Sequence, residues 1–266
     1  MIKIGITGQA GFVGTHLYNE LGLLTDDFVR IPFQDSFFSE EQRLRDFVKQ
    51  CDVIVHLAAM NRHSDSQVIY KTNLRLVNQL IAAMEAEKVT PHVLFSSSSQ
   101  EERDNEYGRS KREGRELLEQ WAKYRGASFT GMVVPNVYGP FGRPNYNSFI
   151  ATFCYKLTHG EQPMVLQNDN VRLIYVGSLC RHIIHKIKHV FASNTLVIER
   201  DEIPFDFEKK VTEILECLEQ YKSLYFDKGI IPVLNNRDEV NLFNTFRCYI
   251  DHATCLLYTS PSPRDS

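Results

Sequence analysis

Residues 2–14 read IKIGITGQAGFVG, in which isoleucines alternate with other residues and glycines then recur at every third position. The alternation is typical of a β-strand, and the apolar spacing that follows the glycines is typical of a helix. A strand that turns through small residues into a helix lets the backbone approach a pyrophosphate at the positive helix N-terminus. The stretch therefore predicts a dinucleotide-binding turn. Its cofactor-binding residues are Gly8, Gly11, Phe12, Val13 and Gly14.

Outward from this turn, strand and helix patterns alternate as far as Pro135, which predicts an α/β fold with a Rossmann-type doubly wound parallel sheet. We expect residues 1–134 to form the dinucleotide-binding domain. We expect residues 135–254 to form a smaller substrate-binding lobe, partly interleaved with the sheet. Strands are predicted at 2–6, 29–31, 51–57, 92–95, 129–134 and 195–198, and lobe helices at 149–157 and about 207–221.

The composition excludes several classes of function. Thirty basic and 33 acidic residues give a formal charge of −3, so no basic field favours nucleic acid or a membrane surface. The six cysteines form no CxxC pair, which indicates free thiols in a reducing compartment. No apolar run is long enough to span a bilayer. We expect a cytoplasmic protein that binds neither nucleic acid nor membrane.

A second motif, Tyr107-Gly-Arg-Ser-Lys111, follows an apolar strand that ends in serines. Tyr107 and Lys111 are four residues apart, so on a helix they share one face. A tyrosine hydroxyl with a pKa near ~10 exchanges protons poorly at neutral pH, and a neighbouring ammonium lowers that pKa. Ser98 can hydrogen-bond a carbonyl oxygen beside Tyr107. The three predict a catalytic triad for hydride transfer, with Lys111 also holding the nicotinamide ribose.

The absence of acidic residues at two places limits the reactions and the cofactor that the sequence favours. Ser98 is followed by Ser99 and Gln100, whereas a sugar-nucleotide dehydratase would use an acidic pair there, so reduction or epimerisation is favoured. No acid closes the strand 29–31 to bind a ribose 2′-hydroxyl, which favours NADP(H) without excluding NAD(H). Arg30 could contact a 2′-phosphate if its strand face allows.

Three histidines, His182, His185 and His189, fall on one face of a predicted helix. Isoleucines supply the apolar stripe of the same helix. The pattern indicates a solvated face rather than a metal site, and we expect no metal.

With these residues in hand, the chain resembles the extended short-chain dehydrogenases/reductases, the NAD-dependent epimerase/dehydratase family, that act on nucleotide sugars. Within them it is most similar to the N-terminal reductase domain of bifunctional capsular polysaccharide enzymes of UDP-N-acetyl-L-fucosamine biosynthesis. The resemblance runs from Met1 to about Ile250. It is carried by residues 56–62 (HLAAMNR), the short interval from Ser98 to Tyr107, residues 135–139 (PNVYG), residues 241–246 (NLFNTF) and, most specifically, residues 143–156 (RPNYNSFIATFCYK).

The resemblance implies reduction of the C4 ketone of a UDP-2-acetamido-2,6-dideoxy-hexos-4-ulose with NADPH, giving a UDP-N-acetyl-6-deoxy-L-talosamine, in a homodimer. It implies Ser98, Tyr107 and Lys111 as catalytic residues. The family's arginine before Pro135 is absent here, where Val133 and Val134 stand. Further cofactor-binding residues implied are Leu57, Ala58, Ala59, Lys111 and Pro135. Substrate-binding residues implied are Asn61, Arg62, Ser98, Asn136, Asn145, Tyr146 and Asn147.

Three alternatives stay open at this point. A UDP-sugar 4-epimerase would use the same triad with tightly bound NAD. A non-catalytic NADP-sensing protein is less favoured because Tyr107 and Lys111 are both present. An inactive fragment is the third, because the resemblance implies a C-terminal cupin domain that supports the dimer, and we expect that domain to be missing here.

Residues 255–266 show neither helical nor strand periodicity and resemble one reading frame of a common sequencing adaptor. We expect them to be a non-native tail.

Overall fold

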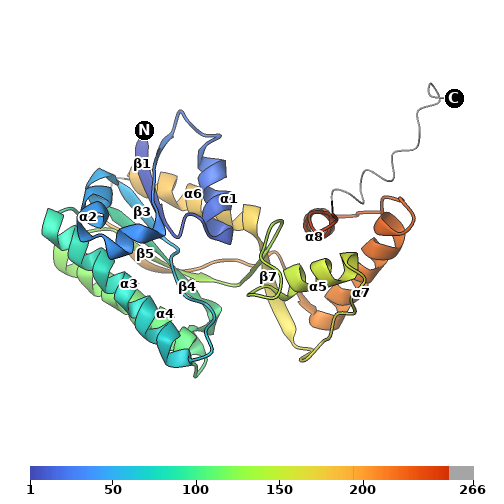
Figure 1. Ribbon diagram of the computed structural model, residues 1–266. Coiled ribbons are helices and arrows are strands. Elements are labelled where there is room, and N and C mark those ends of the chain that lie inside the picture. Colours follow the sequence, from blue (N-terminus) through green and yellow to red (C-terminus); the bar gives the residue numbers. More distant parts are fainter. Residues whose placement is uncertain (194, 252–266) are drawn as a thin grey trace. The chain divides into compact units, whose positions relative to one another are not determined.

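The computed structural model describes residues 1–193 and 195–251, which fall into two units (Figure 1). The first unit comprises residues 1–135 and 176–204, and the second comprises 136–175 with the chain from 205 onward. The predicted tail, 255–266, lies outside the described residues. Within the described part of the chain, no helix has the length and apolar character needed to cross a membrane.

The first unit is built on a six-stranded sheet in the order β2-β1-β3-β4-β5-β8, and every neighbouring pair is parallel. Strand order reverses beside β1, as in doubly wound folds, so the predicted Rossmann-type sheet is confirmed. Its strands are β1 (Ile2–Thr7), β2 (Phe28–Ile31), β3 (Val53–His56), β4 (His92–Ser98), β5 (Phe129–Val134) and β8 (Ile198–Glu202).

Helices cover both faces of this sheet. On one side α2 (Glu41–Gln50), α3 (Ser66–Glu87) and α4 (Glu106–Arg125) pack side by side, and on the other α1 (Phe12–Leu21) packs against α6 (Val176–Ser193) (Figure 1). The short helices η1 (Asp35–Ser39) and η2 (Ser99–Glu102) follow β2 and β4. Both faces of the parallel sheet are therefore covered, which explains why β3 and β5 are buried along their whole length and are mostly apolar.

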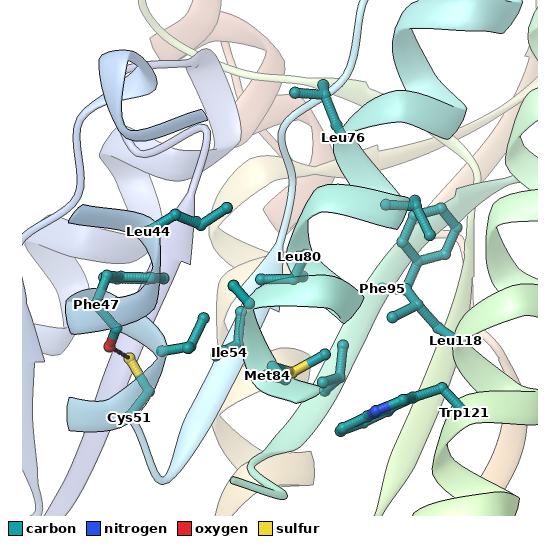
Figure 2. Packing of buried hydrophobic residues seen from close by; sticks show 14 of the residues in the cluster. Leu44, Phe47, Cys51, Ile54, Leu76, Leu80, Met84, Phe95, Leu118 and Trp121 are labelled. Carbon is teal, nitrogen blue, oxygen red and sulfur yellow. Dashed lines mark hydrogen bonds between the residues drawn. The ribbon is translucent and has the colours of Figure 1, made fainter. Parts of the chain in front are cut away.

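The main hydrophobic core lies between the sheet and the layer of α2, α3 and α4. Figure 2 shows Phe47 and Ile54 on one side of Leu80, and Phe95, Leu118 and Trp121 on the other. All of these side chains are buried. Phe95, on β4, also lies beneath Lys111, so this packing supports the site described below.

The second unit holds a three-stranded sheet in the order β6-β7-β9. Strands β6 and β7 are parallel, and β7 and β9 are antiparallel. The elements are β6 (Asn136–Tyr138), α5 (Phe149–Thr158), β7 (Asn170–Tyr175), β9 (Phe207–Lys210), α7 (Val211–Tyr221), η3 (Lys222–Phe226) and α8 (Arg237–Arg247).

The structure corrects two predicted elements. The helix expected from about 207 begins at Val211, because Phe207–Lys210 pairs with β7 and the Glu213 carboxylate then accepts a hydrogen bond from the Lys210 amide (2.7 Å). The strand expected at 195–198 is displaced to Ile198–Glu202, a charged strand at the edge of the large sheet. That strand and α6 belong to the first unit, although both lie within the stretch predicted as the lobe.

Candidate active site

The glycine turn connects β1 to α1 at the carboxyl end of the sheet. Gly8 has φ +71°, and a Cβ there would lie 2.8 Å from the amide nitrogen of Ala58. A Cβ on Gly14 would overlap the carbonyl oxygen of Gly8. The Gly11 amide donates to that same carbonyl (3.0 Å). A side chain at Gly8 or Gly14 would therefore collide with the backbone of the turn itself or of the facing segment, so both positions require glycine.

The N-terminus of α1 suits an anion. Gly11 is its N-cap residue, and no side chain there caps the first turn. The amide groups of the first helical turn have no partner within the helix, and the helix dipole places positive charge beside them. Gly8, Gly11 and Gly14 thus fit a dinucleotide, with Phe12 and Val13 as the first helical residues.

The segment after β3 forms the opposite wall of the turn. Its first residues are tied back to β1, since the amides of Leu57 and Ala58 donate to the carbonyl (3.1 Å) and hydroxyl (3.4 Å) of Thr7. Ala58 also backs directly onto Gly8. Leu57 and Ala58 therefore lie beside the glycine turn, and the stretch with Ala59, Asn61 and Arg62 leads from there to α3. Their contacts with the cofactor or the substrate stay predictions.

Asn73, a residue that the sequence analysis missed, holds this segment to α4. Its side chain is buried. Its Oδ1 accepts from the Met60 amide (2.7 Å), and its Nδ2 donates to the Met60 carbonyl (3.1 Å) and to Ser110 Oγ (2.9 Å). The Ser110 hydroxyl in turn donates to the carbonyl of Tyr107 (2.7 Å). The sequence does contain a signal for this role, because Asn73 is a polar residue within the apolar stripe of α3.

We expect Asn73→Leu to destabilise the protein, because it leaves the Met60 backbone groups and Ser110 without their buried partner. The free energy of unfolding should fall by about 2–3 kcal/mol. Urea denaturation of Asn73→Leu and of Asn78→Leu, an exposed position on the same helix, measures the difference. Equal losses in the two variants would contradict the role assigned to Asn73.

Ser98 ends β4 and is largely buried, with 9% of its surface exposed. Its hydroxyl oxygen accepts from the amide of Gln100 (3.2 Å) and so caps η2. The first turn of α4 lies against η2, because a Cβ on Gly108 would overlap the Gln100 carbonyl oxygen. Asn105 caps α4 by accepting from the Gly108 amide (2.8 Å). The structure therefore brings the turn that carries Tyr107 against the end of the strand that carries Ser98.

Lys111 is buried on α4, one turn beyond Tyr107, with 2% of its surface exposed. Its ammonium donates to the Ser96 carbonyl (2.9 Å) and lies 5.8 Å from the centroid of the Tyr107 ring and 5.1 Å from that of Phe95. Burial lowers the pKa of Lys111 to about 8, against the opposing effect of the Glu101 carboxylate. The predicted pair thus shares one helix face, and its lysine carries a cation in a dry environment.

His56, at the end of β3, is a second buried group that the sequence analysis did not assign. Its Nδ1 lies 2.6 Å from the Thr7 hydroxyl, and its ring stacks on Phe95 at 5.7 Å. Burial, with the charge of Lys111, lowers the pKa of His56 to about 3. The ring is therefore neutral at physiological pH and adds no second cation beside Lys111.

Arg30 does not lie near the glycine turn. Its guanidinium donates to the Tyr18 carbonyl (3.0 Å) and lies 4.2 Å from the Tyr18 ring centroid, against the C-terminal half of α1. Gln34 and Asp35, at the end of the segment after β2, are exposed. The choice of NADP over NAD stays a prediction.

Four of the predicted substrate-binding residues belong to the second unit. Asn136 begins β6, and its Nδ2 donates to the Arg172 carbonyl (3.4 Å). Asn145 has φ +54°, and its amide donates to Thr152 Oγ1 (2.9 Å). The Arg143 guanidinium lies 5.3 Å from the Tyr146 ring centroid. These residues, with Asn147, stay predictions, as does Pro135 at the end of the first segment of the first unit.

One histidine of α6 contacts the strand β8 at the edge of the large sheet, and the other two contact each other. His182 Nε2 lies 2.9 Å from an Asp201 oxygen, and the rings of His185 and His189 stack at 6.4 Å. Over residues 1–193 and 195–251, no group of three or more histidine, cysteine or acidic side chains is arranged to hold a metal ion.

Comparison with known proteins links this geometry to a family. Residues 4–198 match the model of the NAD-dependent epimerase/dehydratase family. Over 224 residues the chain is 30% identical to a UDP-2-acetamido-2,6-beta-L-arabino-hexul-4-ose reductase of Pseudomonas aeruginosa, and the match covers 84% of this chain and 58% of that protein.

Solved structures give the same fold. The capsular polysaccharide assembling protein CapF of Staphylococcus aureus is 29% identical with a TM-score of 0.77, over 95% of this chain and 66% of that one. The structure of RMD from Pseudomonas aeruginosa, a complex with NADPH, is 17% identical with a TM-score of 0.76, over 94% and 98% of the two chains. The chain therefore spans under two thirds of the length of the reductase and of CapF. The likeness to RMD, at 17% identity, shows the fold alone.

Proposed function

The chain belongs to the NAD-dependent epimerase/dehydratase family, and we propose that it reduces the C4 ketone of a UDP-2-acetamido-2,6-dideoxy-hexos-4-ulose with NADPH, giving a UDP-N-acetyl-6-deoxy-L-talosamine. The observation that carries the proposal is the placement of Tyr107 and buried Lys111 on one face of α4, against the end of the strand with Ser98. The name of the Pseudomonas relative, a 4-keto-sugar reductase, supports the substrate class.

Each residue of the proposed triad has a separate task. When bound, the nicotinamide supplies the hydride that the ketone carbon receives. The Tyr107 hydroxyl then gives its proton to the developing alkoxide. The Ser98 hydroxyl donates a hydrogen bond to the same oxygen and stabilises its charge. The Lys111 ammonium stabilises the phenolate that Tyr107 becomes.

The surroundings of Ser98 favour reduction over dehydration. Ser99 and Gln100 follow it, and the nearest buried carboxylate, Glu101, is engaged by Arg115 (3.0 Å). Elimination of water would need a further acid and base at the sugar. We therefore place no dehydratase step at this site.

We expect the rate of reduction to fall as the pH rises through about 8. The pKa of Lys111 is lowered to about 8 by burial, so its ammonium is present below that pH and is lost above it. Loss of the ammonium removes the charge that stabilises the Tyr107 phenolate. Initial-rate measurements that give kcat/KM between about pH 6 and 10 would show this decline as the alkaline limb of the pH profile.

The matched control for this limb is Lys111→Arg, because a guanidinium stays protonated throughout that range. Whatever activity it retains should not decline near pH 8. A limb unchanged in Lys111→Arg would contradict the assignment to Lys111.

Transfer of deuterium tests the proposed reaction against the 4-epimerase alternative. With NADPH deuterated at the transferring position, a reductase places one deuterium at C4 of the sugar for each NADP⁺ formed, as NMR of the product would show. Offered a UDP-N-acetyl-hexose with a hydroxyl at C4 in place of the ketone, an epimerase that recycles tightly bound NAD would give the C4 isomer without label and without net NADPH consumption. That second result would overturn the proposal.

The finer predictions accompany this proposal. Binding of NADP(H) rather than NAD(H), a UDP-linked 4-keto amino sugar as substrate, a homodimer and a cytoplasmic location stay predictions. The contribution of a cupin domain, expected from the resemblance, belongs with them.

A further inference from the structure

Glu101 is a buried acid to which the proposed reaction gives no task. It lies on η2, three residues after Ser98, and its side chain is 4% exposed. An ionised carboxylate is rarely buried without cations or hydrogen-bond donors beside it. Its neighbours therefore indicate what it does.

Three elements supply those neighbours. The Ser97 hydroxyl, on β4, donates to Glu101 Oε1. Arg115 Nε, on α4, lies 3.0 Å from Oε1 and 3.3 Å from Oε2, and Arg200 Nε, on β8, lies 3.8 Å from Oε2. Both oxygens of Glu101 are thus engaged within the protein, by one hydroxyl and two guanidinium groups.

The hydrogen bonds of Glu101 and of the buried Lys111 end on neighbouring residues of one strand. Ser96 and Ser97 are adjacent on β4, and the first accepts from the Lys111 ammonium while the second donates to Glu101. Among the residues that the structure describes, His56, from β3, and Tyr107, from the same helix, also bring titratable groups near Lys111. Burial keeps His56 neutral by lowering its pKa to about 3, so Glu101 is the anion that favours the protonated state of Lys111.

We propose that Glu101 is a positioning residue that serves as the counter-ion of Lys111, with Arg115 and Arg200 holding its carboxylate beside the end of β4. The inference rests on the proposed function, because it makes the charge of Lys111 depend on Glu101 during reduction.

The test compares two substitutions with opposite expected signs. Glu101→Gln keeps the shape and the bond to Ser97 but removes the negative charge, so the pKa of Lys111 should fall by about one unit. Arg115→Gln removes a positive charge and leaves Glu101 held by Ser97 and Arg200, so the pKa of Lys111 should rise. Glu102→Gln, at an exposed neighbouring position, should leave it unchanged.

Two readouts separate this inference from the proposed function. The first is the alkaline limb of kcat/KM, which should move to lower pH in Glu101→Gln, with about a threefold loss at pH 7.5. The second is NMR titration of ¹³C-labelled lysine, with the Lys111 signal assigned by Lys111→Arg, which needs no substrate. If the chain reduced no 4-keto sugar, the proposed function would fail while the NMR titration would still test the counter-ion.

Opposite shifts in Glu101→Gln and Arg115→Gln would support the inference, and Glu101→Asp, which keeps the charge, should restore most of the wild-type titration. Loss of activity in both variants with an unmoved Lys111 titration would overturn it, because Glu101 would then act only by packing η2. If Glu101→Gln does not fold, the direction of the Lys111 pKa shift in Arg115→Gln still tests the inference.

Discussion

Tyr107→Phe should reduce the rate of 4-keto-sugar reduction by about 10²–10⁴-fold, because it removes the group that protonates the alkoxide. The aromatic ring and its packing on α4 remain, so the free energy of unfolding and the affinity for NADPH should change little. Steady-state kinetics with the 4-keto UDP-sugar measures the loss, and fluorescence titration with NADPH measures the affinity.

Tyr124→Phe is the matched control. Tyr124 lies on the same helix, is 81% exposed and belongs to no proposed site, so the same chemical change there should leave kcat unaltered. Wild-type rates in Tyr107→Phe would contradict its role as the acid. A parallel loss of NADPH affinity in that variant would indicate a binding role instead.

Gly14→Ala should weaken NADPH binding by about thirtyfold. The added Cβ would overlap the carbonyl oxygen of Gly8. The backbone of the turn must shift to relieve the overlap, which displaces the amides that would bind the pyrophosphate. Overpacking of this kind costs about 2 kcal/mol, which corresponds to that change in the dissociation constant. Isothermal titration calorimetry with NADPH measures it.

Gly126→Asn is the control for this substitution. Gly126 ends α4 with φ +64°, a Cβ there would meet nothing within 4 Å, and asparagine tolerates this conformation. Its NADPH affinity should equal that of the unmodified chain. An unchanged affinity in Gly14→Ala would show that the glycine turn does not bind the pyrophosphate.

The regular part of the fold was predictable from local patterns. Residues 2–14 predict β1, the glycine turn and α1, because alternation and helical spacing are both local signals. The largely apolar sequences of β3 and β5 indicate a sheet that helices cover on both faces. The pair Tyr107 and Lys111 follows from helical spacing alone.

The rest depends on tertiary contacts that no local pattern reports. Strand β8 has four charged residues after Ile198 and is a strand because it pairs with β5. Phe207–Lys210 could equally extend α7, and its pairing with β7 decides otherwise. Asn73 and Glu101 acquire their roles from residues far along the chain, namely Met60, Ser110, Arg115 and Arg200. Polar residues buried in this way are visible only once their partners are known.

The measurement that tests the central claim most directly is the oxidation of NADPH, and separately of NADH, by the purified chain. A dehydratase would make the 4-keto UDP-N-acetyl sugar in the same cuvette, and the reaction without sugar would serve as the blank. The account predicts sugar-dependent loss of NADPH that is faster than any loss of NADH. No sugar-dependent loss of either cofactor, by protein that purifies with bound NAD and interconverts UDP-hexoses at their C4 hydroxyl, would contradict it.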